Sequence, residues 1–97
     1  MPTFISMMSW TDQGIRSVKD SPKRLAAARE AAKKLGVEIK QVFLTTGEFD
    51  LLAVLEPPNG DNVAKLTLAL GSQGSLRSCT VRAWPEAEYA KLISELP

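Results

Sequence analysis

The segment FDLLAVLE, residues Phe49–Glu56, indicates the architecture of the chain most clearly. Its apolar side chains occupy both faces of an extended strand, because successive residues of a strand point to opposite faces. The segment Thr3–Trp10 has the same two-sided character, with Phe4 on one face and Ile5 on the other. Short runs that are apolar throughout are typical of fully buried strands. We therefore expect these two segments to be the central strands of a sheet.

Two further strands are expected on either side of this pair. The segment Val37–Thr46 has its apolar phase broken near Lys40 or Gln41, which a β-bulge explains. The segment Ser75–Trp84 alternates cleanly between apolar and polar residues. Both segments therefore predict strands with one buried face.

Three helices are expected between and after these strands. Apolar residues recur at spacings of three and four between Ser21 and Gly36, and again between Asn59 and Gly71. A short amphipathic segment follows Pro85. The order β-α-β-β-α-β with a short C-terminal helix predicts an α+β, ferredoxin-like fold, which we treat as a single domain over residues 1–97.

The two main helices of such a fold cover only one face of its sheet. We assign Phe4, Met8 and Trp10 to the uncovered face, and Cys79 to the face under the helices. A large uncovered apolar face predicts an interaction surface. We therefore expect two sheets to pack together in a homodimer, as in a dimeric α+β barrel.

Composition excludes several classes of function. The chain has 12 Lys and Arg against 11 Asp and Glu, so its net charge of +1 predicts no nucleic-acid partner. It has no histidine, which removes histidine-based catalysis and most zinc sites, and a single cysteine, which cannot form an internal disulfide. We expect neither a metal nor a cofactor.

The location of the protein is inferred from two further absences. The longest apolar run, Leu51–Leu55, is far too short to span a bilayer, and no basic segment precedes Arg16 as a secretory signal would require. These features predict a cytoplasmic protein with no membrane partner.

The turn Gly47–Asp50 and three other stretches of the chain together resemble the GYD-domain family. The Gly-Tyr-Asp signature of that family falls on Gly47, Phe49 and Asp50, so phenylalanine replaces the signature tyrosine and its hydroxyl is missing. The resemblance implies a dimeric α+β barrel relative, and it implies no reaction. The four stretches are Trp10–Arg16, Lys19–Arg24, Gly47–Asp50 and Leu68–Ser72.

A ligand site is predicted at one edge of the sheet, where the strand order brings three loops together. Trp10, Asp50 and Ser78 lie at strand ends that meet there, and Arg16 lies just inside the helical segment that is expected to begin after Trp10. An aromatic wall, a carboxylate and a hydroxyl around an apolar cavity are typical of small-ligand sites. Arg16 is expected to hold an anionic group. The alternative is that these loops contain Gly and Asp only for their turns.

Arg16 also belongs to a basic cluster whose members recur at helical spacings. Such a cluster is either an anion site or a solvated helix face balanced by nearby acids. The other members are Lys19, Lys23 and Arg24.

Three classes of function remain open at this point. The first is a homo-oligomeric domain that binds or senses a small molecule. The second is a cofactor-independent enzyme of the isomerase or monooxygenase type, for which Asp50, Glu48 or a lysine would have to move protons. The third is a structural assembly module.

Overall fold

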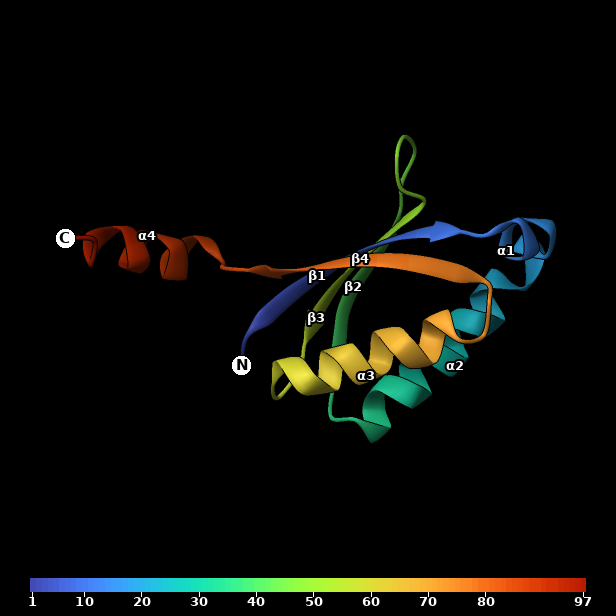
Figure 1. Ribbon diagram of the computed structural model, residues 1–97, viewed down its shortest axis with the longest axis horizontal. Helices are drawn as coiled ribbons and strands as arrows, with labels where there is room; N and C mark the ends of the chain where they lie inside the picture. Colours follow the sequence, from blue (N-terminus) through green and yellow to red (C-terminus); the bar gives the residue numbers. More distant parts are fainter.

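The computed structural model describes residues 1–97 and contains one antiparallel sheet of four strands. The strand order is β2-β3-β1-β4, so β1 and β3 are central as predicted (Figure 1). This arrangement confirms the α+β, ferredoxin-like fold. The strands are β1 (Thr3–Trp10), β2 (Glu38–Leu44), β3 (Leu51–Glu56) and β4 (Leu76–Ala83).

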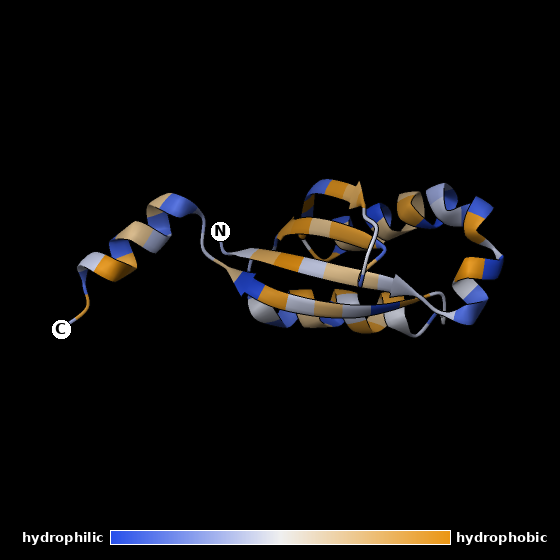
Figure 2. Cartoon of the chain, turned by 90° about the horizontal axis from the view of Figure 1, so that it is seen from above, coloured by the Kyte–Doolittle hydropathy of each residue, from blue (hydrophilic) through white to orange (hydrophobic).

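The helices form a layer on one side of this sheet, with one exception. Helices α2 and α3 lie beneath the strands in Figure 1, whereas α4 extends beyond the end of the sheet (Figures 1 and 2). No helix has the length and hydropathy needed to cross a membrane. The helical segments are α1 (Asp12–Arg16), the 3₁₀ turn η1 (Val18–Asp20), α2 (Ser21–Lys34), α3 (Gly60–Gly71) and α4 (Glu86–Ser94).

Side-chain caps define where α1 and α3 begin. The Thr11 hydroxyl accepts a hydrogen bond from the Gly14 amide at 3.1 Å, and the Asn59 side chain accepts one from the Asn62 amide at 2.9 Å. Both satisfy amides that have no partner within the helix. Helix α2 begins at Ser21, directly after the turn η1, with no side-chain cap hydrogen bond.

The predicted bulge is present in β2 and determines which of its residues face the helices. The pairing register shifts between Ile39 and Gln41, so that Ile39 lies opposite Leu55 and Val42 lies opposite Ala53. An extra residue in one strand reverses the phase of all that follow it. Because of the bulge, Ile39 and Val42 lie on the same face of the sheet.

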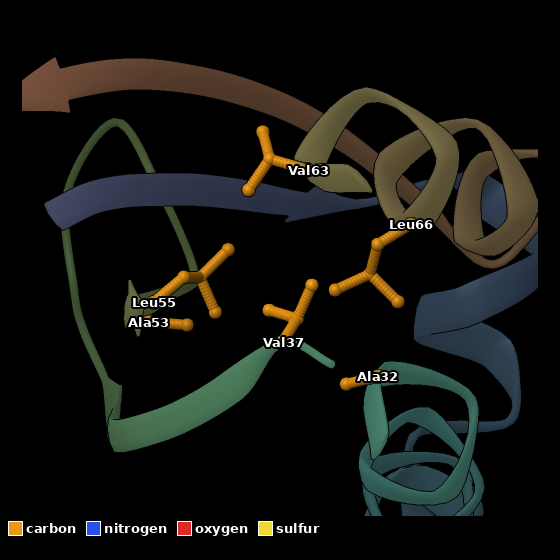
Figure 3. Close-up of a cluster of buried hydrophobic side chains, with 6 residues drawn as sticks. All are labelled: Ala32, Val37, Ala53, Leu55, Val63 and Leu66. Carbon is orange, nitrogen blue, oxygen red and sulfur yellow. The ribbon is translucent and has the colours of Figure 1, made fainter. Parts of the chain in front are cut away.

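The core lies between β3 and the two main helices. Leu55 and Ala53 of β3 meet Val63 and Leu66 of α3 and, from the end of α2, Ala32 (Figure 3). Leu66 is only 1% exposed. This small, dry cluster holds the helices against one half of the sheet.

The facing of β1 and β4 corrects two sequence-based assignments. Met8 and Trp10 lie under the helices, whereas Cys79 is exposed. The register explains this result, because Phe4 pairs with Leu55 and so shares the helix-facing side of the sheet. Both faces of β1 are apolar, so its hydropathy pattern alone does not determine its orientation.

Candidate functional site

An apolar cavity of about 90 Å³ lies between the sheet and the helices. Of its 18 lining residues, 12 are hydrophobic. Met8, Leu51 and Ala53 come from the central strands, while Leu25 and Leu70 come from α2 and α3. An enclosed apolar space of this kind is the usual setting for a small-ligand site.

The cavity exists because the helices stand over different strands and the residues between them are small. Helix α2 packs mainly on β2 and α3 mainly on β4, with only slight contact between the two helices. The side chains beneath the gap include Ser6, Ala28 and Ala53. Three small side chains do not fill the space that larger ones would occupy.

Arg24 lies in the wall of this cavity, and its guanidinium is bound to the turn beside it. Its Nη1 donates to the Ser17 carbonyl at 2.9 Å and to the Ser17 hydroxyl at 3.1 Å, and its Nη2 donates to the Gly14 carbonyl at 3.3 Å. No carboxylate lies within ion-pair distance of it. A partly buried cation is therefore fixed in place by neutral acceptors alone.

Two loops meet at one end of the cavity. The Thr11 amide donates to the Ser75 carbonyl at 3.1 Å, and the Thr11 hydroxyl donates to the Gly74 carbonyl. A Cβ on Gly14 would lie 2.1 Å from the Ser75 carbonyl oxygen, so only glycine allows this approach. The backbone of this junction, including buried Ser75, closes the cavity on that side.

Trp10 and Asp50, two of the residues predicted for the site, lie next to each other. Trp10 lines the cavity. The Asp50 carboxylate accepts a hydrogen bond from the Trp10 backbone amide at 3.0 Å, and the Asp50 amide donates to the Met8 carbonyl at 2.9 Å. Asp50 therefore extends the pairing of β1 beyond β3, and it is not among the cavity residues.

The other two predicted residues lie farther from this space. Ser78 is exposed and borders a smaller pocket of about 20 Å³ under α3. Arg16 is exposed at the end of α1 and lines neither pocket. The structure thus places Trp10 in the wall of the main cavity and Ser78 at the smaller pocket. Asp50 contacts Trp10 without lining the cavity, and Arg16 lines neither space.

The three loops expected at this edge do not all converge. The loops that carry Gly14 and Gly74 are joined by the hydrogen bonds of Thr11. The hairpin around Gly47, by contrast, projects from the opposite side of the sheet, away from the helices (Figure 1). It is tied down only at its base, where the Thr45 hydroxyl donates to the Phe49 carbonyl at 2.7 Å.

The sequence predicts Arg24 only as a member of the basic cluster. A signal for its special position is present, however, because Arg24, Ala28 and Ala32 follow one another at spacings of four on one face of α2. Ala32 is 1% exposed, and Ala28 lines the cavity. The small residues of this stripe mark the buried face onto which Arg24 also projects.

No group of three or more Asp, Glu, Cys or His residues is arranged to hold a metal ion. None of the 18 cavity residues is acidic. The polar groups around the cavity are hydroxyls, the Gln73 amide and the Arg24 guanidinium. Groups of this kind can hold and orient a ligand by hydrogen bonds and charge.

The fold shows the structural class of the protein: it is an α+β protein with a ferredoxin-like sheet and a cavity under its helices. A profile of the GYD domain matches residues 4–93, so the chain belongs to the GYD-domain family. The chain is also 32% identical over 89 residues to a protein from Thermus thermophilus, "Glutamine synthetase and cystathionine beta-lyase binding protein". That match spans 91% of this chain and 94% of the relative.

Solved structures share the fold at lower sequence identity. The structure of FFRP-DM1 is similar with a TM-score of 0.60 and 20% identity, covering 87% of this chain and all of that one. The structure of TTHA0845 from Thermus thermophilus is similar with a TM-score of 0.55 and 21% identity, covering 88% and 95% of the two chains. These likenesses confirm the arrangement of strands and helices.

Proposed function

We propose that this protein is a homo-oligomeric domain that binds a small apolar molecule between its sheet and its helices. The observation that carries the proposal is the cavity of about 90 Å³, with 12 hydrophobic residues among 18 and a few polar groups in its wall. Enclosed apolar spaces with sparse polar groups are how proteins hold small ligands. Trp10 would form part of the wall, as the sequence predicts.

Binding is favoured over the enzyme alternative by the chemistry of the same wall. Proton transfer needs a group that can give and take a proton at the substrate. The cavity residues include no Asp, Glu, Lys, Cys or Tyr, and the Asp50 carboxylate is engaged by the Trp10 amide. The wall is thus better equipped to hold a molecule than to change it.

Tryptophan fluorescence tests the proposal directly. In a Trp84→Phe variant, Trp10 is the only tryptophan and reports on the cavity. We expect small apolar compounds such as 1-hexanol to shift its emission and to raise the melting temperature. The matched Trp10→Phe variant retains Trp84, which lies outside the cavity, and its emission should stay constant. Unchanged emission and melting temperature in the Trp84→Phe variant with every compound would contradict the proposal.

The homo-oligomeric part of the proposal is supported by the amount of exposed surface. The chain exposes 6574 Å², whereas a compact monomer of its mass exposes about 5,500 Å². The difference, about 1,100 Å², is similar to the roughly 800 Å² that each partner buries in an ordinary specific interface. The radius of gyration, 14.6 Å, likewise exceeds the roughly 12.5 Å expected for 97 residues.

Two apolar surfaces contribute to the exposed area, and a second copy of the chain is the occupant we propose for both. One is the sheet face opposite the helices, where Phe43 is 49% and Val81 is 42% exposed. The other is the apolar side of α4, where Leu92 and Ile93 are about half exposed. Light scattering at micromolar concentration should give about twice the chain mass of 10.6 kDa. A monodisperse 10.6-kDa species would contradict the homodimer.

A second candidate function, binding to another protein, is favoured by the named role of the Thermus relative. The charge distribution fits it, because residues 12–34 carry seven basic and three acidic side chains while the remainder carries five and eight. A basic surface of this kind steers an acidic partner. Calorimetry with glutamine synthetase and cystathionine beta-lyase, comparing wild type with Lys19→Glu and Lys23→Glu, tests it. Binding that is absent, or equal in all three proteins, would contradict docking through this surface.

A further inference from the structure

We propose that the ligand of the cavity is a small monocarboxylic acid with a compact apolar chain, whose carboxylate is held by Arg24. The inference rests on the proposed binding function and assigns its ligand class. It depends on the hydrogen bonds and charge of one residue of the cavity wall, Arg24.

The guanidinium of Arg24 has more N–H donors than acceptors around it. A guanidinium carries five N–H donors, and three of those of Arg24 are used by Ser17 and Gly14. The two others have no partner in the chain. A carboxylate accepts two parallel hydrogen bonds from a guanidinium better than a neutral group does.

Arg24 also lacks a counter-charge. The ion pairs of the chain are those of Lys40 with Glu38 and Glu56, and of Arg82 with Glu88. Burying a charge without an opposite one is unfavourable, and a bound anion relieves that cost. The three bonds to the α1–η1 turn hold the guanidinium in position before a ligand arrives, so little conformational entropy is lost on binding.

The remaining wall determines the rest of the ligand. Hydrophobic side chains from β1, β3, α2 and α3 surround the space next to Arg24, and a volume of about 90 Å³ suits a chain of a few carbon atoms. Because no lining residue is acidic, an α-ammonium group would be buried without a counter-ion. The site should therefore prefer a simple carboxylic acid to an amino acid of the same length.

Calorimetry on the wild-type protein with four six-carbon probes tests this ligand class. The probes are hexanoate, hexanamide, norleucine and 1-hexanol, which share an apolar chain and differ in their polar groups. We expect hexanoate to bind at least tenfold more tightly than hexanamide or norleucine. Equal affinity of hexanoate and hexanamide would overturn the assignment of a carboxylate, while leaving the cavity as the binding site. Failure of all four to bind would instead contradict the proposed function itself.

A pair of variants tests the residue. Arg24→Gln removes the cation from the cavity wall, and Arg16→Gln removes one of the same chemistry from the exposed end of α1. Hexanoate affinity should fall at least tenfold in Arg24→Gln and less than twofold in Arg16→Gln. The reverse order, or an equal loss in both, would overturn the role of Arg24. If Arg24→Gln does not fold, the contrast between hexanoate and hexanamide on the wild type still decides the question.

Discussion

The two faces of the sheet differ in what covers them. The face under α2 and α3 carries the core, with Leu55 3% and Ala53 4% exposed, and next to it the cavity. On the opposite face, Phe43, Cys79 and Val81 are exposed although none of them is charged. Hydropathy therefore does not distinguish the two faces of this sheet.

This difference shows that the position of the helices, rather than apolar character, decides which face becomes the core. The helix-facing side is covered incompletely, because Ser6 and Ala53 are small and the two helices pack on different strands, α2 mainly on β2 and α3 mainly on β4. It retains a cavity as a result. The other side exposes large apolar side chains, among them Phe43 and Val81, and exposed apolar surface of this kind is typical of interaction sites. One face is suited to a small ligand, and the other to a second protein surface.

The largest expected effect is the difference in stability between truncating a leucine under the helices and truncating one on the open face, which is the face opposite the helices. Leu55→Ala should lower the free energy of unfolding by about 2–5 kcal/mol, because it opens a cavity in the core. Leu52→Ala, on the open face, should cost about 1 kcal/mol or less in the monomer. Urea unfolding at a protein concentration where light scattering shows monomer measures both. Equal losses would mean that the two faces are packed alike.

The sequence predicted the elements of this fold well because each carries a local signal. The bulge in β2 is visible as a phase break, and the caps at Thr11 and Asn59 are hydrogen-bonding residues before apolar periodic segments. The resemblance to the GYD-domain family was also correct, with the match extending over residues 4–93. Such features depend on neighbours in the chain and can therefore be read from it.

Local signals do not predict which residues of β1 point toward the helices. Its pairing with β3 sets Phe4 opposite Leu55 and Met8 opposite Leu51, a relation between segments far apart in sequence. A shift of one residue would exchange the faces without changing any local pattern. The sequence does not single out Arg24 for a similar reason: only the packing of α2 shows which basic residue of the cluster lies against the cavity.

The closed end of the covered face depends on the close approach of the Gly14 backbone to the Ser75 backbone, next to the hydrogen bonds of Thr11. Gly14→Ala places a methyl group 2.1 Å from the Ser75 carbonyl oxygen, so the two loops must separate. We expect a loss of about 1–3 kcal/mol in the free energy of unfolding, as for other overpacked sites. Gly71→Ala is the matched control: no atom lies within 4 Å of its added Cβ, and alanine favours the helix by up to about 1 kcal/mol. A Gly14→Ala protein as stable as wild type would show that the junction is loose.

Thiol labelling of Cys79 tests whether two copies of the chain pack through the open face. The sequence predicted that Cys79 would be inaccessible under the helices, whereas the structure exposes it on the opposite side. If two copies pack through this face, a thiol reagent should label Cys79 at least tenfold more slowly in the dimer than in a Leu52→Asp monomer. The comparison requires a folded variant, which circular dichroism establishes. Equally rapid labelling of both proteins at a concentration where the wild type is dimeric would show that copies associate elsewhere.

The smallest effect is expected at Asp50, which lies at the edge between the two faces. Its carboxylate accepts the Trp10 amide hydrogen, a bond that an asparagine oxygen also makes. Asp50→Asn should therefore change the free energy of unfolding by less than about 1 kcal/mol, whereas Asp50→Ala leaves the amide without its partner and should cost about 1–2 kcal/mol. Since Asp50 lies outside the cavity wall, hexanoate affinity should be the same in Asp50→Asn as in wild type. A loss of affinity in Asp50→Asn at unchanged stability would show instead that the carboxylate contacts the ligand, as the sequence first predicted, and that the position of Trp10 is adjusted when the ligand binds.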